Sequence, residues 1–219
     1  MQGVWPPQGS ARGRGMSGAG VPGQDLLVPS RLPHGGDGRL VTETFFTADL
    51  HFGHRFMREL RQSQTGIPAD FHDQWLIERW NSVVGPRDEV WMLGDFSFMP
   101  PARTEPYFSA LRGRKHLVIG NHDPRQIVQR LGWESVHELV SRRFDGQRIV
   151  MCHYPLLTWA NAHYGTWMLH GHSHGGLTGP VTTRLDVGID CHPEYRPFSL
   201  DEVQTVMLGR DYVPVDHHG

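Results

Sequence analysis

The feature that most constrains the fold of this chain is a repeated order: a short apolar segment, then metal-binding side chains, then a loop. Five such polar clusters occur, and they are Asp49-Leu50-His51, Gly94-Asp95, Gly120-Asn121-His122-Asp123, His153 and Gly171-His172-Ser173-His174. Short apolar runs bounded by turn signals are typical of buried strands. Because ligands in α/β proteins collect at the carboxyl ends of strands, we expect the five clusters to meet at one edge.

The pattern after Leu40 alternates between strands and helices, which predicts an α/β fold with a mixed sheet. Strands are predicted over residues 43–48, 89–93, 116–119, 136–140, 148–152, 167–170 and 184–187, and helices over residues 70–84, 107–111, 125–131 and 199–208. Asp145-Gly146 predicts a hairpin turn between two of these strands. Ser199 and Glu202 match a capping box, which marks the start of the last helix.

Composition separates a tail from a folded domain. Residues 1–40 are rich in Gly, Pro and Ser and lack hydrophobic periodicity, so we predict a disordered tail, followed by one domain over residues 41–219. A net charge of -2 gives no general attraction to nucleic acid or anionic membranes. Two cysteines form no disulfide framework, and neither a membrane-spanning run nor a signal-peptide pattern is present. We therefore expect a cytoplasmic protein without a membrane partner.

In order and spacing, the five clusters resemble the motifs of the calcineurin-like metallophosphoesterases. The segment from Asp49 to His54, Asp-Leu-His-Phe-Gly-His, resembles a small bacterial and phage branch of that family. The resemblance covers residues 45–190. It implies a metallophosphatase fold, a four-layer α/β/β/α sandwich of two mixed β-sheets flanked by helices. It also implies two divalent metal ions, with Mn expected first and Fe, Zn, Ni, Co and Mg as alternatives.

The resemblance also implies a role for each polar residue of the clusters. The metal ligands would be Asp49, His51 and His174 for the first ion, Asn121, His153 and His172 for the second, and Asp95 as the bridge. A hydroxide held between the ions would attack phosphorus. His122 would stabilise the developing charge and help protonate the leaving oxygen, while Asp123 would orient the His122 imidazole. His54 and Arg55 are candidates for binding the substrate phosphate.

Each cluster, taken alone, also fits a structural interpretation. Gly94-Asp95 is common in strand-ending turns, and a single residue such as His153 is often structural. His172 and His174, two positions apart, would point to the same side if they lay on a strand. Cys152 stands where relatives often have Gly and is expected to be a small core residue. Asp190 and His192 are further candidates for the neighbourhood of the site.

The spacing of the clusters bears on the substrate. Residues 96–120 and 154–169 are too few to form a cap domain, so we expect an open, shallow site. Such a site favours phosphodiester hydrolysis, with a cyclic nucleotide, a nucleic-acid end or another small diester as substrate. A phosphomonoesterase of the same mechanism is the alternative enzyme. A non-catalytic scaffold that retains the fold, and a nucleic-acid-processing subunit, are the alternatives from other classes. The sequence does not fix the oligomeric state.

The predicted tail can be tested by truncation. Deletion of residues 1–39 is expected to leave the melting temperature nearly unchanged, because the segment lacks the apolar pattern that core packing needs. Thermal unfolding of the full-length and truncated proteins measures this. A clear fall in melting temperature on truncation would show that the tail packs on the domain.

Overall fold

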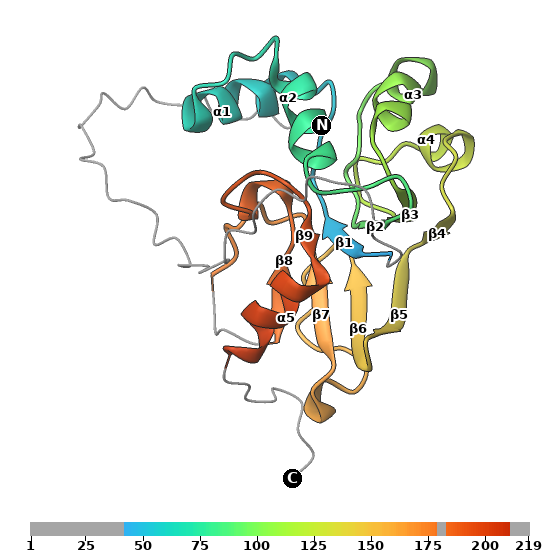
Figure 1. Ribbon diagram of the computed structural model, residues 1–219, viewed down its shortest axis with the longest axis vertical. Helices are drawn as coiled ribbons and strands as arrows, with labels where there is room; N and C mark the ends of the chain where they lie inside the picture. The colour runs from blue at the N-terminus through green and yellow to red at the C-terminus, as the bar shows by residue number, and fades with distance from the viewer. Residues whose placement is uncertain (1–41, 179–182, 211–219) are drawn as a thin grey trace, which may run out of the picture.

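The computed structural model describes residues 42–178 and 183–210, so the predicted tail lies outside the described residues. Figure 1 shows two sheets with helices packed around them. The strands are β1 (Thr44–Thr47), β2 (Glu89–Met92), β3 (Arg114–Val118), β4 (Ser135–His137), β5 (Leu139–Phe144), β6 (Gln147–Cys152), β7 (Trp167–His170), β8 (Arg184–Asp186) and β9 (Phe198–Ser199). The helices are α1 (Arg55–Thr65), α2 (His72–Asn81), α3 (Pro101–Ala110), α4 (Arg125–Arg130) and α5 (Leu200–Leu208), with short 3₁₀ helices η1 (Ala162–Tyr164) and η2 (Ile189–Cys191).

Both sheets are mixed, and both contain a run of parallel strands. The first sheet has the order β4-β3-β2-β1-β9, in which β1 to β4 are parallel and β9 is antiparallel. The second has the order β5-β6-β7-β8, in which β6, β7 and β8 are parallel and β5 forms an antiparallel hairpin with β6. Each sheet therefore presents the carboxyl ends of neighbouring parallel strands along one edge.

Alternating side chains on the strands build the layers. In β1, Phe45 packs into the core under the helices, while the next residue, Phe46, packs into the core between the two sheets. Val90 and Trp91 of β2 divide in the same way, as expected for a strand whose successive side chains point to opposite faces. The α/β fold of two mixed sheets flanked by helices, predicted from the resemblance, is confirmed.

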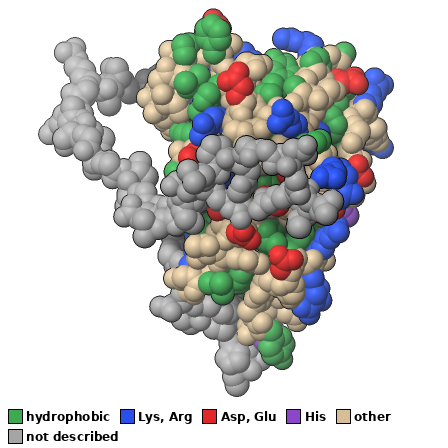
Figure 2. All heavy atoms as spheres, in the orientation of Figure 1, with side chains coloured by type: hydrophobic (Ala, Val, Ile, Leu, Met, Phe, Trp, Pro, Cys, Tyr) green, Lys and Arg blue, Asp and Glu red, His purple; other side chains and the backbone are tan. Residues whose placement is uncertain are grey.

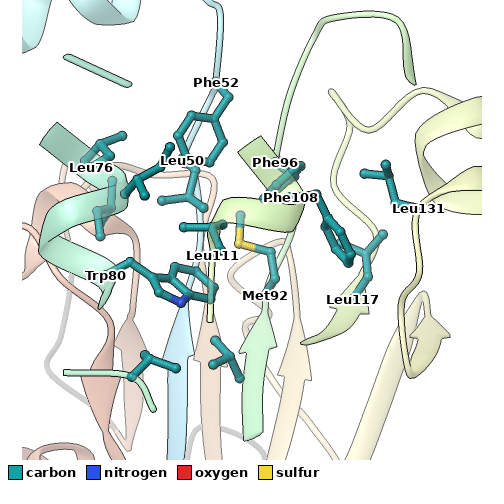
Figure 3. Packing of buried hydrophobic residues seen from close by; sticks show 14 of the residues in the cluster. Leu50, Phe52, Leu76, Trp80, Met92, Phe96, Phe108, Leu111, Leu117 and Leu131 are labelled. Carbon is teal, nitrogen blue, oxygen red and sulfur yellow. The ribbon is translucent and has the colours of Figure 1, made fainter. Parts of the chain in front are cut away.

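Helices α2 and α3 cover the outer face of the first sheet (Figure 3). Leu76 and Trp80 of α2 lie on one side of Met92, and Phe108 of α3 lies on the other. Trp80 is 1% exposed, and its indole N–H donates to the carbonyl of Arg112 at 3.0 Å, so its polar atom is satisfied in the core.

The outer face of the second sheet has a thinner cover. Residues 154–166 contain only the 3₁₀ helix η1, and Trp159 and Ala162 of this segment pack on Val150, Cys152 and Met168. Cys152 is thus a buried core residue at the end of β6, as predicted. Since this segment is a short loop, it forms no cap over the strand ends.

Several predicted elements differ from the structure. Helix α1 and the short strand β9 were not predicted, and α3 begins six residues before the predicted residue 107. The segment predicted as one strand over residues 136–140 is two strands: Val136 pairs with Leu117 in the first sheet, and Leu139 pairs with Cys152 in the second. The chain changes sheet at Glu138, because each half has its partner in a different sheet.

The surface is mixed in charge. On the face shown in Figure 2, acidic and basic side chains are interspersed where the described residues are visible, in keeping with the net charge of -2. None of the helices in residues 42–178 and 183–210 is both long enough and apolar enough to cross a membrane.

Helix α5 begins in the capping box that the sequence predicted. The Ser199 side chain accepts from the N–H of Glu202 at 3.2 Å, and the Glu202 carboxylate accepts from the N–H of Ser199 at 2.8 Å. The same carboxylate receives two hydrogen bonds from the buried Arg196 guanidinium, at 2.6 and 3.1 Å. Burial opposes ionisation, but the nearby His192 imidazole and Arg196 outweigh it and lower the pKa of Glu202 to about 2.

This pKa predicts an acid-labile contribution to stability. Because the folded-state pKa lies below the ordinary value of 4.5, ionised Glu202 stabilises the fold above pH 4.5 and loses this effect as the pH falls toward 2. Wild-type protein should lose about 2 kcal/mol of this contribution by pH 3. Urea unfolding of wild type and Glu202→Gln between pH 6 and pH 3 measures the difference. A stability difference that does not shrink with acidity would contradict the assigned ion pair.

Candidate metal centre

The parallel strands bring the five clusters to one edge, as the sequence predicted. In the first sheet, the clusters follow β1, β2 and β3, which are neighbours. In the second sheet, His153 follows β6 and the last cluster follows β7, which are also neighbours. The two sheets are joined at this edge because the N–H of Ile189, beyond β8, donates to the carbonyl of Ala48, beyond β1, at 2.9 Å.

Left-handed backbone is concentrated at the predicted ligands. Eight described residues other than Gly have positive φ, and five of them are predicted ligands: Asp49, His51, Asp95, His172 and His174. This conformation costs roughly 1–2 kcal/mol per residue for L-amino acids. Strain of this kind persists where the surrounding structure enforces it, which is typical of functional sites.

Two glycines are required by close approach of the loops. A Cβ on Gly94, whose φ is +90°, would lie 2.6 Å from the Cα of Gly120 and 2.6 Å from Nδ1 of His153. A Cβ on Gly120 would lie 2.3 Å from Oδ1 of Asp95. The glycines of these two clusters therefore allow the second and third clusters to touch.

The first group of ligands is formed by Asp49, His51 and His174. One ligand atom from each lies within 4.8 Å of the others, and Nε2 of His51 is 3.2 Å from Nε2 of His174. Burial, followed by the neighbouring His174, lowers the pKa of His51 to about 2. His51 is therefore neutral at physiological pH, which is the form of imidazole that binds metals.

The second group is formed by Asn121, His153 and His172. Nε2 of His153 and Nδ1 of His172 lie 2.9 and 3.0 Å from Oδ1 of Asn121. Nδ1 of His153 is 2.7 Å from the carbonyl oxygen of Leu93, so this nitrogen carries the hydrogen and donates it. The lone pair of His153 Nε2 then faces the side-chain amide of Asn121, and a cation between this nitrogen and the amide oxygen would satisfy both acceptors.

Asp95 lies between the two groups. Its Oδ2 is 3.7 Å from Nε2 of His51 and 3.5 Å from Nε2 of His153. Its other oxygen, Oδ1, accepts from the backbone N–H of His122 at 2.8 Å, which fixes the carboxylate. One carboxylate oxygen is thus placed midway between the two imidazoles, as a bridging ligand must be.

The charge of the site also fits bound cations. Burial raises the pKa of Asp49 well above its usual range, and although His174 opposes this, the carboxylates of Asp186 and Asp95 add to it. Ionising Asp49 in this surrounding is therefore costly without a positive partner. Hard oxygen and imidazole ligands together suit Mn, Zn, Fe, Co, Ni or Mg, and no thiolate is among them.

Two predicted interpretations are corrected by the geometry. His172 and His174 do not lie on a strand, because β7 ends at His170 and both residues have left-handed backbone. His172 turns toward Asn121 and His174 turns toward His51, so one of the two histidines belongs to each group of ligands.

Asp123 was predicted to orient the His122 imidazole. Its carboxylate instead accepts the backbone N–H groups of Asp95, Phe96 and Gly120 at 2.8–2.9 Å, and so joins two clusters.

The candidate phosphate-binding residues lie at the start of α1. Nδ1 of His54 accepts from the N–H of Met57 at 3.2 Å and so caps this helix. Arg55 is exposed and pairs with Glu59 at 2.8 Å. Both contacts are local, so substrate contact by either residue stays a prediction.

Of four further residues near the centre, Arg61 and Phe98 were not considered from the sequence, and Asp190 and Tyr154 were only candidates for its neighbourhood. Asp190 lies 2.6 Å from Nδ1 of His174. Arg61 of α1 binds Asp190, and no sequence signal distinguished it from other helix arginines. The ring of Phe98 lies 4.2 Å from that of His122, and the ring of Tyr154 lies 4.9 Å from that of His172.

The two mixed sheets flanked by helices agree with the fold that the resemblance to the calcineurin-like metallophosphoesterases implies, and Asp and His side chains from its motifs lie together at one edge. The gene 66 protein of Mycobacterium phage L5 is 38% identical to this chain, over 74% of this chain and 93% of the phage protein. The chain therefore belongs to the family of that phage protein.

Other comparisons concern the fold. No family model matches the chain. AQ665 from Aquifex aeolicus, a protein of unknown function, has the same fold, with a TM-score of 0.60 and 21% identity over 76% of this chain and 100% of AQ665. YfcE, a phosphoesterase from E. coli, gives a TM-score of 0.38 and 18% identity over 67% of this chain and 76% of YfcE, and this similarity is too low to carry an argument.

Metal binding should stabilise the protein measurably. An ion at 100 times its dissociation constant adds about 2.7 kcal/mol, which corresponds to a rise in melting temperature of roughly 5–10 °C for a chain of this size. Thermal unfolding with chelator and with Mn²⁺ measures the shift. Asp95→Asn should reduce it, because the bridging charge is lost. Asp145→Asn makes the same change at a left-handed residue of the β5–β6 turn, and should keep the full shift.

Proposed function

We propose that this protein is a metal-dependent phosphodiesterase with two divalent ions at the strand ends. The observation that carries the proposal is the position of Oδ2 of Asp95. This oxygen lies 3.7 Å from Nε2 of His51 and 3.5 Å from Nε2 of His153. A single carboxylate between two sets of neutral or anionic ligands suits a pair of ions that share it. Two-metal sites of this kind are used for the hydrolysis of phosphate esters.

Two bound ions would supply the positive charge that attracts an anionic phosphate and makes a water molecule acidic enough to act as a nucleophile. The residues that would hold them are Asp49, His51 and His174 on one side and Asn121, His153 and His172 on the other, with Asp95 between. Mn²⁺ is the first candidate, since the site combines carboxylate, amide and imidazole ligands.

His122 is proposed as the general acid. Its backbone is fixed by the hydrogen bond to Asp95, and its side chain is exposed at the edge of the site, with its ring against Phe98. In the described residues, the Asp and His side chains close enough to share an ion form the groups Asp49-His51-His174 and Asp49-Asp95-His153, and His122 is in neither. An imidazole in this position is free to move a proton to the leaving oxygen of a bound ester.

The proposed substrate is a small phosphodiester, such as a cyclic nucleotide or the end of a nucleic acid. The loop over residues 154–166 forms no cap, and the chain between Asp95 and Asn121 is occupied by α3 and β3. The site is therefore open to a substrate that carries groups on both sides of the phosphate. A monoester needs no such access, which makes the diester the better supported of the two.

The enzymatic proposal predicts activity that depends on metal. Purified protein should hydrolyse bis-p-nitrophenyl phosphate with Mn²⁺ and lose activity in chelator. p-Nitrophenyl phosphate, tested with Mn, Ni, Co, Zn and Mg, separates a diesterase from a monoesterase. Folded protein that binds metal but hydrolyses neither ester with any of these ions would favour the scaffold alternative.

The role of His122 is tested by leaving-group dependence. His122→Ala should keep two ions per chain and lose about 10²–10⁴-fold in rate for an ester with an alkyl leaving group. The loss should be smaller with p-nitrophenolate, which leaves without protonation. Elemental analysis and kinetics measure both effects. A defect that is independent of leaving-group basicity, or a loss of metal as large as that of Asp95→Asn, would exclude this role.

A further inference from the structure

A buried arginine connects two loops that carry ligands. Arg61 lies on α1 and has no exposed surface. Its Nη2 donates to the backbone carbonyl of Asp49 at 2.6 Å, and its Nη1 donates to that of Leu50 at 2.9 Å. Nε and Nη2 also donate to the two carboxylate oxygens of Asp190, at 2.6 and 2.8 Å. One guanidinium therefore holds the first cluster and the loop after β8 together.

Asp190 also contacts His174, the third ligand of the first site. Its Oδ2 lies 2.6 Å from Nδ1 of His174. A carboxylate bound to a guanidinium only accepts, so the hydrogen of the His174 ring is on Nδ1. In the neutral ring, which is the form that binds a metal, Nε2 then has a free lone pair, and this nitrogen lies 3.2 Å from Nε2 of His51.

We propose that Arg61 and Asp190 are positioning residues that assemble the first metal site. Arg61 fixes the backbone of Asp49 and Leu50, and Asp190 fixes the ring orientation and tautomer of His174. Two ligands of the first site, Asp49 and His174, thus contact one buried ion pair directly, and the remaining one, His51, follows the backbone of Leu50 that Arg61 holds. The inference rests on the proposed function in one respect, which is that the centre binds two ions.

The second site is held in a different way. Its ligand His153 donates Nδ1–H to the backbone carbonyl of Leu93, at 2.7 Å. A backbone carbonyl stays in place when side chains are substituted. Changes at Asp190 should therefore weaken the first site and leave the second intact, which makes the second site an internal control. Losing a carboxylate that orients a metal-binding histidine typically costs 10–100-fold in affinity.

The decisive variant is Asp190→Asn. An amide has one accepting oxygen, so it cannot accept from both the guanidinium and the Nδ1–H of His174 in the present geometry. Its N–H₂ group would face one of these donors, or would reverse the tautomer of His174 and place a hydrogen on Nε2. We expect the affinity for one of two Mn²⁺ ions to fall 10–100-fold, while the other is retained.

Two measurements on the full-length protein can detect the weaker binding of one Mn²⁺ ion without an activity assay. Isothermal titration with Mn²⁺, together with elemental analysis, gives stoichiometry and affinity. Electron paramagnetic resonance separates coupled ion pairs from isolated ions. Wild type should give the exchange-coupled signal of two neighbouring Mn²⁺ ions. Asp190→Asn, at Mn²⁺ levels that saturate wild type, should give the resolved hyperfine pattern of one isolated ion.

Matched variants separate positioning from stability. Glu202→Gln disrupts another buried arginine–carboxylate pair, Arg196 with Glu202, so it should lower the melting temperature but retain both ions. The double variant Arg61→Met/Asp190→Leu removes both charges and leaves no lone buried charge, which is the form of substitution that buried ion pairs tolerate. It should fold and bind one ion tightly.

The possible results are distinguishable. Two ions bound with unchanged affinity in Asp190→Asn, or in the double variant if Asp190→Asn does not fold, would overturn this inference and leave the proposed function standing. Equal weakening of both ions would also overturn it, since the second site would then depend on the pair. Wild-type protein that binds no divalent ion would overturn both the inference and the proposed function.

Discussion

The site depends on a sharp left-handed turn immediately after the strands that carry ligands. Asp49, Asp95 and His172 each follow a strand end and have positive φ, so their side chains turn back across the edge between the two sheets. The strain is offset because the turns bind one another. The N–H of Asp49 donates to the carbonyl of Gly94, and the N–H of His172 donates to the Asp49 carboxylate. Each strained loop is therefore held by a neighbouring loop.

These interlocked turns explain why the centre is preorganised. Ligands from both sheets are placed by backbone hydrogen bonds and by buried carboxylates such as Asp123, whose oxygens receive three N–H groups. Little reorganisation is needed when cations bind, which keeps the loss of conformational freedom small. Electrostatic stabilisation in enzymes is largest where polar groups are fixed before the reaction begins. The same arrangement destabilises the metal-free protein, because carboxylates and imidazoles are crowded without a compensating positive charge.

The sequence predicted most of what depends on local pattern. The bounds of β7, the β5–β6 turn at Asp145-Gly146 and the capping box at Ser199 all follow from neighbouring residues. Helix α1 was missed because it contains few apolar residues and is stabilised by polar contacts of Arg61 that are distant in sequence. No local sequence pattern indicated the left-handed backbone of His172 and His174 either. Asp190 was only a candidate neighbour, but it could have been assigned to the site, since it follows a predicted strand just as the five clusters do.

The candidate ligands and the aromatic side chains beside them lie in different parts of the structure. The candidate ligands follow strands of both sheets. The backbone hydrogen bond from the N–H of Ile189 to the carbonyl of Ala48 joins one sheet to the other. Phe98 and Tyr154 lie against His122 and His172 but are partly exposed and project from loops. Loops on a rigid scaffold tolerate substitution far better than the elements they connect. Relatives with the same ligands can therefore differ at these two positions without losing metal. Under the proposed function, the strand ends would hold the ions, and the side chains of Phe98 and Tyr154 would contact the groups that the phosphate carries.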